Sequence, residues 1–235
     1  MKEYVVVDIE TTGTQPLHSD IIEIGAVYIK EGQVVGKFSE LVCPTQEISE
    51  YITGITGITN ELVKDARCIE EVLPEFIAFC KEAPLVGHNL IVFDYRMLKV
   101  KATRLGLLFQ KQAVDTLILA RKFLKDLPSR RLGDLCTHYR IELTHAHRAY
   151  DDAYATYELY CKLNEAFYTM HPEAFEPEMM TWEMPKWVGI TPKQSSFLKA
   201  LSEKYEVALE QPIHAYSKSE ASRLIDKIIS EYGRL

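Results

Sequence analysis

The sequence has few of the features that mark an exported or membrane-embedded protein. Its 235 residues include five cysteines, scattered without a CxxC pair or the cysteine and histidine spacing of a zinc finger. No cationic start precedes an apolar signal core, and no apolar run approaches the roughly 20 residues that a membrane-spanning helix needs. These absences predict a reduced, cytoplasmic protein without structural zinc and without a membrane segment.

The sequence also has no excess of positive charge. Its formal net charge is -7, whereas a protein that coats nucleic acid by bulk attraction usually has a basic surface. The charge leaves open an enzyme whose nucleic-acid substrate is held through bound metal ions. Apolar residues make up 47% of the chain, which is enough for the core of one large domain with a small additional module.

The order of the predicted elements indicates an α/β fold. Three strands come first, which predicts an antiparallel meander, and helices then alternate with strand-like pieces. The repeated phrase "ITGITGIT" at 52–59 is expected to be a loop. This order indicates a mixed sheet flanked by helices. The main predicted elements are strands at 4–9, 21–29, 34–42 and 84–89, and helices at 68–83, 93–105 and 149–168.

The composition changes after residue 168. Prolines without clean periodicity predict a linker over 169–189. Residues 190–235 are expected to form a small helical C-terminal module of unassigned role. It carries two capping boxes, Thr191 with Gln194 and Ser217 with Glu220, each at the start of a predicted helix.

Two acids close the first predicted strand, in the phrase "VVVDIETTG" at 5–13. Because side chains alternate along a strand, Asp8 and Glu10 project from the same face. Like charges at such close range raise one another's pKa unless a cation lies between them, and Mg²⁺ prefers oxygen ligands. The pair therefore predicts a metal site, with an ordinary exposed strand end as the alternative.

Two later segments complete a pattern with these acids. "VGHNLIVFDYRML" presents Asp94 where a strand passes into a helix, and "HRAYDDAYAT" presents His147 and Asp152 at the start of another helix. Together the three segments resemble the motifs of the DEDDh family of 3′–5′ exonucleases, which includes the proofreading epsilon subunit of bacterial DNA polymerase III. The resemblance implies an exonuclease domain over 1–168 with an RNase H-like α/β fold, a mixed five-stranded sheet flanked by helices.

The resemblance also implies roles for individual residues. Asp8, Glu10, Asp94 and Asp152 are expected to bind two divalent metal ions, Mg²⁺ or Mn²⁺, and His147 to be the general base. Positions five apart on one helix point roughly 140° from each other. His147 is therefore expected on the loop before the helix, with Asp152 in the first turns and Asp151 as a solvated helix-start charge.

Four further residues are candidates for substrate binding. Thr11 and Thr12 follow the first acids, where the family commonly contacts the terminal nucleotide, and a plain turn is the equal alternative. His88 and Asn89 are expected to orient the substrate or their own loop, with a structural hydrogen bond as the alternative.

Two other residues near the motifs receive structural expectations. Asp115 is expected to cap a helix rather than to support the metal shell. His145, in the phrase "HAH", is expected to be a surface residue.

The function that the resemblance implies is a metal-dependent 3′–5′ exonuclease. It would release nucleoside 5′-monophosphates from single-stranded or frayed DNA, in proofreading or repair. An exoribonuclease is the first alternative, because the motifs do not read the 2′-hydroxyl. A non-catalytic subunit that docks on a polymerase or binds nucleic acid is the second. The expected partners are a single-stranded DNA or RNA 3′ end and a DNA polymerase subunit.

Overall fold

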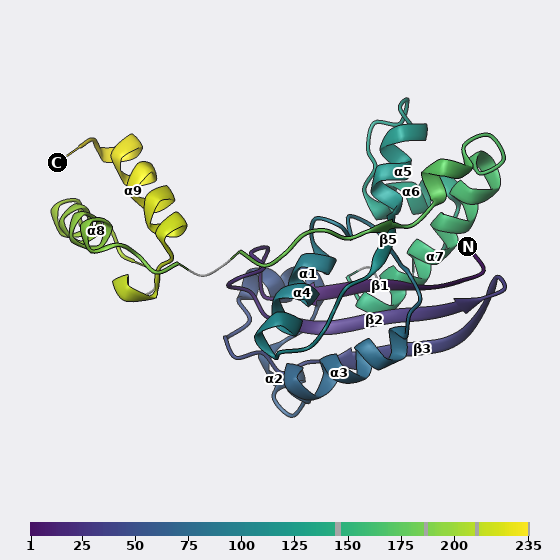
Figure 1. Cartoon of the computed structure of the whole chain (residues 1–235), viewed down its shortest axis with the longest axis horizontal. Helices are drawn as coiled ribbons and strands as arrows, with labels where there is room; N and C mark the ends of the chain where they lie inside the picture. Colours follow the sequence, from purple (N-terminus) through teal and green to yellow (C-terminus); the bar gives the residue numbers. More distant parts are fainter. Residues whose placement is uncertain (144–146, 186–187, 210–211, 235) are drawn as a thin grey trace. The chain divides into compact units, whose positions relative to one another are not determined.

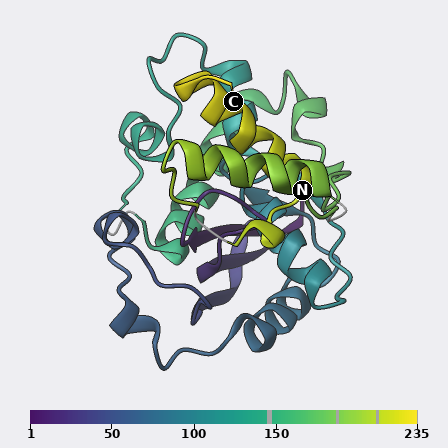
Figure 2. The ribbon, with the colours of Figure 1, turned by 90° about the vertical axis from the view of Figure 1, so that its left-hand side faces the viewer.

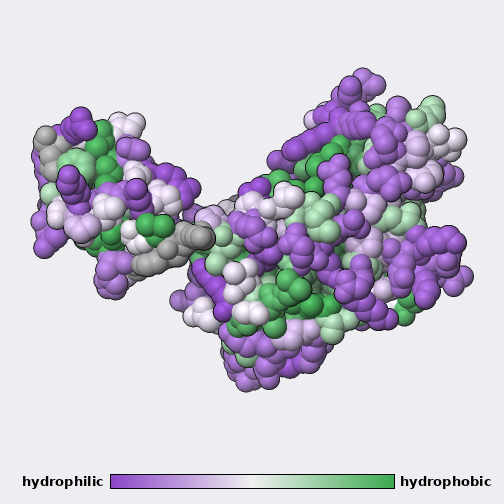
Figure 3. All heavy atoms as spheres, in the orientation of Figure 1, coloured by the Kyte–Doolittle hydropathy of each residue, from purple (hydrophilic) through white to green (hydrophobic). Residues whose placement is uncertain are grey.

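The computed structural model describes residues 1–143, 147–185, 188–209 and 212–234. It divides into two compact units, Met1–Met184 and Pro185–Leu235 (Figure 1). Within the described residues, none of the helices combines the length and the apolar character needed to cross a membrane. Hydrophilic side chains cover much of the face of the first unit seen in Figure 3.

The first unit is built on a mixed sheet with the strand order β3-β2-β1-β4-β5-β6. β1 pairs antiparallel with β2 and parallel with β4, and β4 pairs parallel with β5. Five strands were expected, and the described residues contain a sixth, which pairs antiparallel with β5. The strands are β1 (Glu3–Thr11), β2 (Ile21–Lys30), β3 (Gln33–Leu41), β4 (Leu85–Gly87), β5 (Gln112–Asp115) and β6 (Glu178–Met179).

Helices cover both faces of this sheet (Figures 1 and 2). Val5, Val7 and Ile9 of β1 pack into the core that contains α3 and α4. Tyr4 and Val6 pack into the opposite core, with α5, α6 and α7. The alternation along β1 therefore points Asp8 and Glu10 toward the α7 side. The helices are α3 (Ile69–Cys80), α4 (Asp94–Arg104), α5 (Thr116–Phe123), α6 (Leu132–Tyr139) and α7 (Ala149–Phe167).

The expectation of a loop over 52–59 is wrong. Glu50–Thr56 forms helix α1, and Asn60–Val63 forms helix α2. Ser49 caps α1 by accepting a hydrogen bond from the Ile52 N–H, and Gly57 ends it with a left-handed φ of 69°. The β-branched residues and glycine of the repeat have low helix propensity, so two caps define a helix that composition does not favour.

The segment expected as a linker over 169–189 folds in part onto the first unit. Pro172–Phe175 forms a 3₁₀ helix, and Phe175 is buried in the core beside α7. β6 then adds to the edge of the sheet, and the Met180 N–H donates to the Lys111 carbonyl. Its prolines begin a 3₁₀ helix and flank a short edge strand, positions that tolerate proline.

The second unit consists of α8 (Pro192–Lys204), a 3₁₀ helix (Ile213–Ala215) and α9 (Lys218–Tyr232). Both predicted capping boxes are confirmed, at Thr191 with Gln194 and at Ser217 with Glu220. The helices bury a small apolar core of their own, which includes Leu198, Leu201, Ala221 and Ile228.

Candidate active site

The candidate site lies at one edge of the sheet, where three parallel strands end. Asp8 and Glu10 lie near the end of β1, His88 and Asn89 follow β4, and Asp115 ends β5. Val6 is paired with Val86 and Gly87 with Asp115, so these strand ends are level. The carboxyl ends of parallel strands are where ligands bind in α/β sheets.

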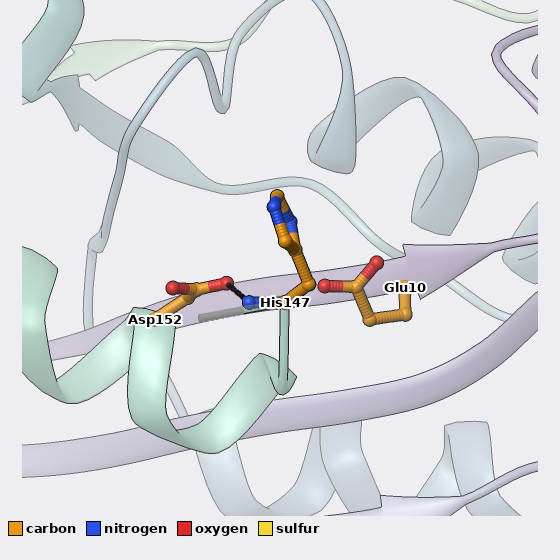
Figure 4. Close-up of side chains that lie close together, drawn as sticks. All are labelled: Glu10, His147 and Asp152. Atoms are coloured by element: carbon orange, nitrogen blue, oxygen red, sulfur yellow. Dashed lines mark hydrogen bonds between the residues drawn. The ribbon is translucent and has the colours of Figure 1, made fainter. Parts of the chain in front are cut away.

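Three of the predicted residues form a tight cluster. Glu10, His147 and Asp152 each offer a ligand atom, and these atoms lie within 4.8 Å of one another. Figure 4 shows Glu10 on β1, Asp152 on α7 and His147 on the segment that leads into α7, with the imidazole between the two carboxyl groups. The fold thus brings together residues that are far apart in the sequence.

His147 is held in place through its backbone. It precedes α7 in a left-handed conformation, with φ of 65°, and its N–H donates to Asp152 Oδ2 at 2.9 Å. Asp152 is buried and belongs to the cluster with Glu10, whereas Asp151 does not. His145 lies outside the described residues.

Asp94 joins the site from the other side of β1. It begins α4, is only 2% exposed, and its Oδ1 accepts a hydrogen bond of 3.1 Å from the Ile9 N–H. This bond places the Asp94 carboxyl group beside β1 at the residue between Asp8 and Glu10. The four predicted acids therefore converge on one end of β1.

The pKa values of all four acids are raised, because the acids are buried and close to one another. Loss of solvation raises the pKa of Asp8 well above its ordinary value, and the charges of Asp94, Asp152 and Glu10 raise it further. Burial raises the pKa of Glu10 and of Asp94 to about 8. Burial raises the pKa of Asp152 to about 6, partly opposed by its hydrogen bond from His147. Such a group of carboxylates needs either protons or cations near neutral pH.

A buried ion pair, missed from the sequence, fixes the start of α7. Glu23 lies opposite Glu10 on β2 and is 1% exposed. Its carboxylate accepts from Arg148 Nη2 at 2.8 Å and Nε at 3.2 Å, and from the Ala149 N–H at 3.0 Å. Because Arg148 directly follows His147, this clamp also fixes the position of the histidine.

Gly25 allows α7 to approach the sheet so closely. It lies opposite Asp8, and a Cβ atom at this position would come within 2.1 Å of the Ala149 carbonyl carbon and the Tyr150 nitrogen. A side chain at residue 25 would therefore push the first turn of α7 away from the acids on β1.

Thr11 and Thr12, predicted to contact substrate, have their hydroxyl groups engaged within the protein. The Thr11 hydroxyl donates to the Gly13 carbonyl at 2.7 Å. The Thr12 hydroxyl accepts from the Asp20 N–H at 2.9 Å, and the Thr12 N–H donates to the Asp20 carbonyl at 2.9 Å. These bonds form the turn that was the alternative interpretation.

His88 is bonded through both ring nitrogens. Its Nδ1 lies 2.9 Å from the Thr116 hydroxyl, and its Nε2 lies 2.9 Å from the Arg130 carbonyl. Burial lowers the pKa of His88, so the ring is neutral at neutral pH and Nε2–H is the donor to that carbonyl. His88 thus ties the end of β4 to the loop before α6.

Asp115 holds the loop that leads to Asp94. It caps α5, as predicted, by accepting from the Leu117 N–H at 2.9 Å. It also accepts from the N–H groups of Asn89 at 3.0 Å and Ile91 at 3.1 Å. Asn89 has a left-handed φ of 64°, which this pairing stabilises. The hydrogen bonds to Asn89 and Ile91 depend on the pairing of β4 with β5, so they could not be predicted from the helix-cap pattern of Asp115 alone.

A cavity of about 750 Å³ opens beside the acids. Its lining contains Asp8, Glu10, His147 and Asp152, together with residues of α5, of the loop at 128–131 and of α6. His88 and Asn89 also contribute to the lining.

Comparison with known proteins decides the family. Residues 5–160 match the RNase T family model, described as Exonuclease. The chain belongs to the RNase T exonuclease family. A DNA polymerase III of the PolC type from Caldanaerobacter subterraneus is 47% identical over 163 residues, which cover 69% of this chain and 12% of that protein. The exonuclease chain therefore spans a small part of the length of this relative.

Solved exonuclease structures share the fold. Escherichia coli exonuclease I in complex with a dT13 oligonucleotide has a TM-score of 0.64 at 22% identity, covering 74% of this chain and 43% of that one. Exonuclease X with 5′ overhanging duplex DNA has a TM-score of 0.58 at 28% identity, covering 70% and 92%. The nuclease domain of 3′hExo, a DEDDh family member bound to rAMP, has a TM-score of 0.60 at 19% identity, covering 71% and 93%. The predicted DEDDh resemblance and RNase H-like fold are confirmed.

Proposed function

We propose that this exonuclease removes nucleoside 5′-monophosphates from the 3′ end of single-stranded or frayed DNA, with the activity in residues 1–168. The observation that carries the proposal is the cluster of Glu10, His147 and Asp152, which the charges of Asp8 and Asp94 extend, at the edge of an open cavity. Membership of the exonuclease family supports this use of the site.

Asp8, Glu10, Asp94 and Asp152 would hold two divalent cations, Mg²⁺ or Mn²⁺. The donor set fits such ions, because it consists of carboxylate oxygens whose pKa values are raised by burial and by neighbouring carboxylates, both of which a bound cation would offset. When bound, two such cations supply positive charge for the attacking water and for the departing 3′ oxygen of a phosphodiester. The protein's part is to hold the carboxylates in place, through β1 for two of them and through the starts of α4 and α7 for the others.

His147 would accept the proton of the attacking water at a ring nitrogen. Its side chain is exposed toward the cavity that the acids line, and its backbone is anchored on both sides. Asp152 accepts its N–H, and Glu23 holds the next residue, Arg148. An imidazole held near the reacting water is the usual general base at neutral pH.

DNA is the preferred substrate in this proposal. The relative named above is a DNA polymerase, and the exonuclease I and exonuclease X structures contain DNA. The 3′hExo structure contains rAMP, which keeps the RNA 3′ end as the competing substrate. The polymerase relative also supports a DNA polymerase as a partner, for proofreading. The scattered cysteines, free wherever the structure describes them, support a cytoplasmic location.

The test is digestion of a 5′-labelled single-stranded DNA oligonucleotide and of its RNA counterpart, with Mg²⁺, Mn²⁺ or EDTA. The expected result is a ladder that shortens from the 3′ end, forms faster on DNA, requires metal and disappears in Asp8→Ala. Asp65→Ala, which removes an exposed acid near α2, is the matched control and should cleave like the wild type. Absence of a ladder from folded protein with either metal would overturn the proposal, and a faster ladder on RNA would change the substrate.

A further inference from the structure

The cavity beside the acids has a second, cationic wall. Arg121, in the last turn of α5, and Arg131, at the N-terminal cap of α6, both line it. Asp8 and Glu10 line the same cavity from β1. The lining thus combines carboxylates with two arginines, although the chain as a whole carries a net charge of -7.

These two arginines differ from their neighbours in how their charge is used. Arg148 is paired with Glu23, and Arg130 donates from Nη2 to the carbonyls of Leu124 at 3.0 Å and Lys125 at 2.6 Å. Within the described part of the chain, neither Arg121 nor Arg131 makes an ion pair, and both side chains are exposed. Their positive charge is therefore available to a ligand in the cavity.

Among the described residues, the acid on the same wall makes no ion pair with either arginine. Asp134, in the first turn of α6, also lines the cavity. Its Oδ2 accepts a hydrogen bond of 2.5 Å from the Ser129 hydroxyl. Ser129 Oγ in turn accepts from the Arg131 N–H at 3.3 Å. Asp134 thus helps to order the turn before α6 rather than pairing with either arginine.

The wall is also anchored to the rest of the site. The Arg130 guanidinium closes the loop onto Leu124 and Lys125, and the Arg130 carbonyl accepts from His88 Nε2. His88 directly follows β4, at the strand edge where the acids lie. Arg131 is therefore presented by a fixed backbone, which reduces the entropy lost when a ligand binds.

We propose that Arg121 and Arg131 bind the internucleotide phosphates on the 5′ side of the scissile bond. The inference rests on the proposed 3′–5′ exonuclease function. In a strand shortened from its 3′ end, every phosphate other than the scissile one lies on the 5′ side. Arg121 and Arg131 line the same cavity as the acids that would hold the metal ions, so their positive charge can attract these phosphates while the scissile phosphate lies at the acids.

Two substrates separate this subsite from the chemistry. The p-nitrophenyl ester of thymidine 5′-monophosphate has one phosphate, whereas a single-stranded DNA oligonucleotide extends across the cavity. Arg121→Ala and Arg131→Ala should each raise the KM for the oligonucleotide roughly fivefold to tenfold. They should leave kcat on the oligonucleotide and all rates on the ester within about twofold. The matched control is Lys30→Ala. It removes one cation from the far end of β2, where Lys30 pairs with Glu3 and not with the acids of the site.

Binding without cleavage gives an independent measurement. In the cleavage-deficient Asp8→Asn background with Mg²⁺, fluorescence anisotropy of a labelled oligonucleotide should show weaker binding for each arginine variant. The slope of log K against log salt should fall in magnitude by about 0.7 for each phosphate that the variant no longer neutralises. Arg121→Lys and Arg131→Lys should retain this slope, because a single positive charge remains.

Three results would overturn the inference. Equal losses on the ester and on the oligonucleotide would mean that the arginines support the fold of the site. Unchanged KM and unchanged affinity would mean that the arginines do not contact the DNA strand. A slope of log K against log salt equal to that of the control variant would mean the same. Failure of the exonuclease itself is seen separately, as wild-type protein that cleaves neither substrate, while the anisotropy measurement still decides whether the arginines bind phosphate.

Discussion

Glu10 and Glu23 face each other across β1 and β2, but their surroundings carry opposite charge. Glu23 is almost completely buried and receives an arginine and a backbone N–H. Glu10 lies among the carboxylates of Asp8, Asp94 and Asp152, and Arg148 offsets its raised pKa only in part. A buried carboxylate with a partner makes the loss of either partner costly, whereas burial among like charges costs stability and leaves a site for a cation.

The largest expected effect is on the unpaired acids. Asp152→Asn should lower kcat by about a thousandfold or more, because it removes a proposed metal ligand from the site. The same change should not lower the melting temperature in EDTA, since it relieves repulsion among the acids and keeps an acceptor for the His147 N–H. Single-turnover rates and thermal melts of the same preparation check both statements. Normal turnover in this variant would remove Asp152 from the metal ligands.

The next effect concerns His147, the proposed general base. His147→Ala should lower kcat by about 10²- to 10⁴-fold, the range for losing a general base. Metal affinity should stay within about twofold of wild type, because the carboxylates are unchanged. Isothermal titration with Mn²⁺ and measurements of kcat check the two parts. A large loss of Mn²⁺ affinity would instead make His147 a metal ligand.

Removing the paired acid should, unlike the two changes above, lower the stability of the fold. Glu23→Ala should lower the free energy of unfolding by about 2–3 kcal/mol, below the range for fully buried pairs because the Arg148 side chain is 42% exposed. Urea unfolding with Mg²⁺ present checks this value. Glu40→Ala breaks the surface pair with Arg67 and should cost about 1 kcal/mol or less. A Glu23 variant as stable as the Glu40 variant would show that the clamp on α7 contributes little.

Of these two acids, only Glu10 was predicted from the sequence. Strand alternation placed Asp8 and Glu10 on one face, and the resemblance of the motif segments to a known family proposed Asp94, His147 and Asp152 as their partners. Glu23 lies in an apolar strand whose pattern does not reveal what packs on it, and its partner is more than 120 residues away. The clamp depends on Gly25, whose role also appears only when α7 is in place.

Elsewhere the prediction succeeded where local signals act alone. Both capping boxes of the second unit and the Asp115 cap involve residues within a few positions of each other. The short helix α1 was missed because its sequence has low helix propensity and its caps decide the outcome. β6 was missed because a strand of two residues is defined by pairing with β5 and not by its own pattern.

The last prediction concerns the pH dependence of stability. It tests whether the acids of the site, unlike the paired Glu23, are buried without a compensating charge. Without metal, the folded state holds protons on Glu10 and Asp94 up to a pKa of about 8 and on Asp152 up to about 6. In the unfolded chain these groups titrate near pH 4. Between about pH 4 and pH 8 the folded state therefore binds more protons, so its free energy of unfolding falls as the pH rises.

The measurement is thermal or urea unfolding from pH 5 to pH 8, in EDTA and with Mg²⁺. In EDTA the stability of the wild type relative to Asp8→Asn should decrease toward pH 8. The stabilisation by Mg²⁺ should increase over the same interval, because the cation replaces the lost protons and binds the folded state alone. A constant difference between wild type and Asp8→Asn across this interval would contradict the raised pKa values. The four acids would then be solvated like ordinary surface carboxylates. They would differ from Glu23 only in being less buried, and not in lacking a partner charge.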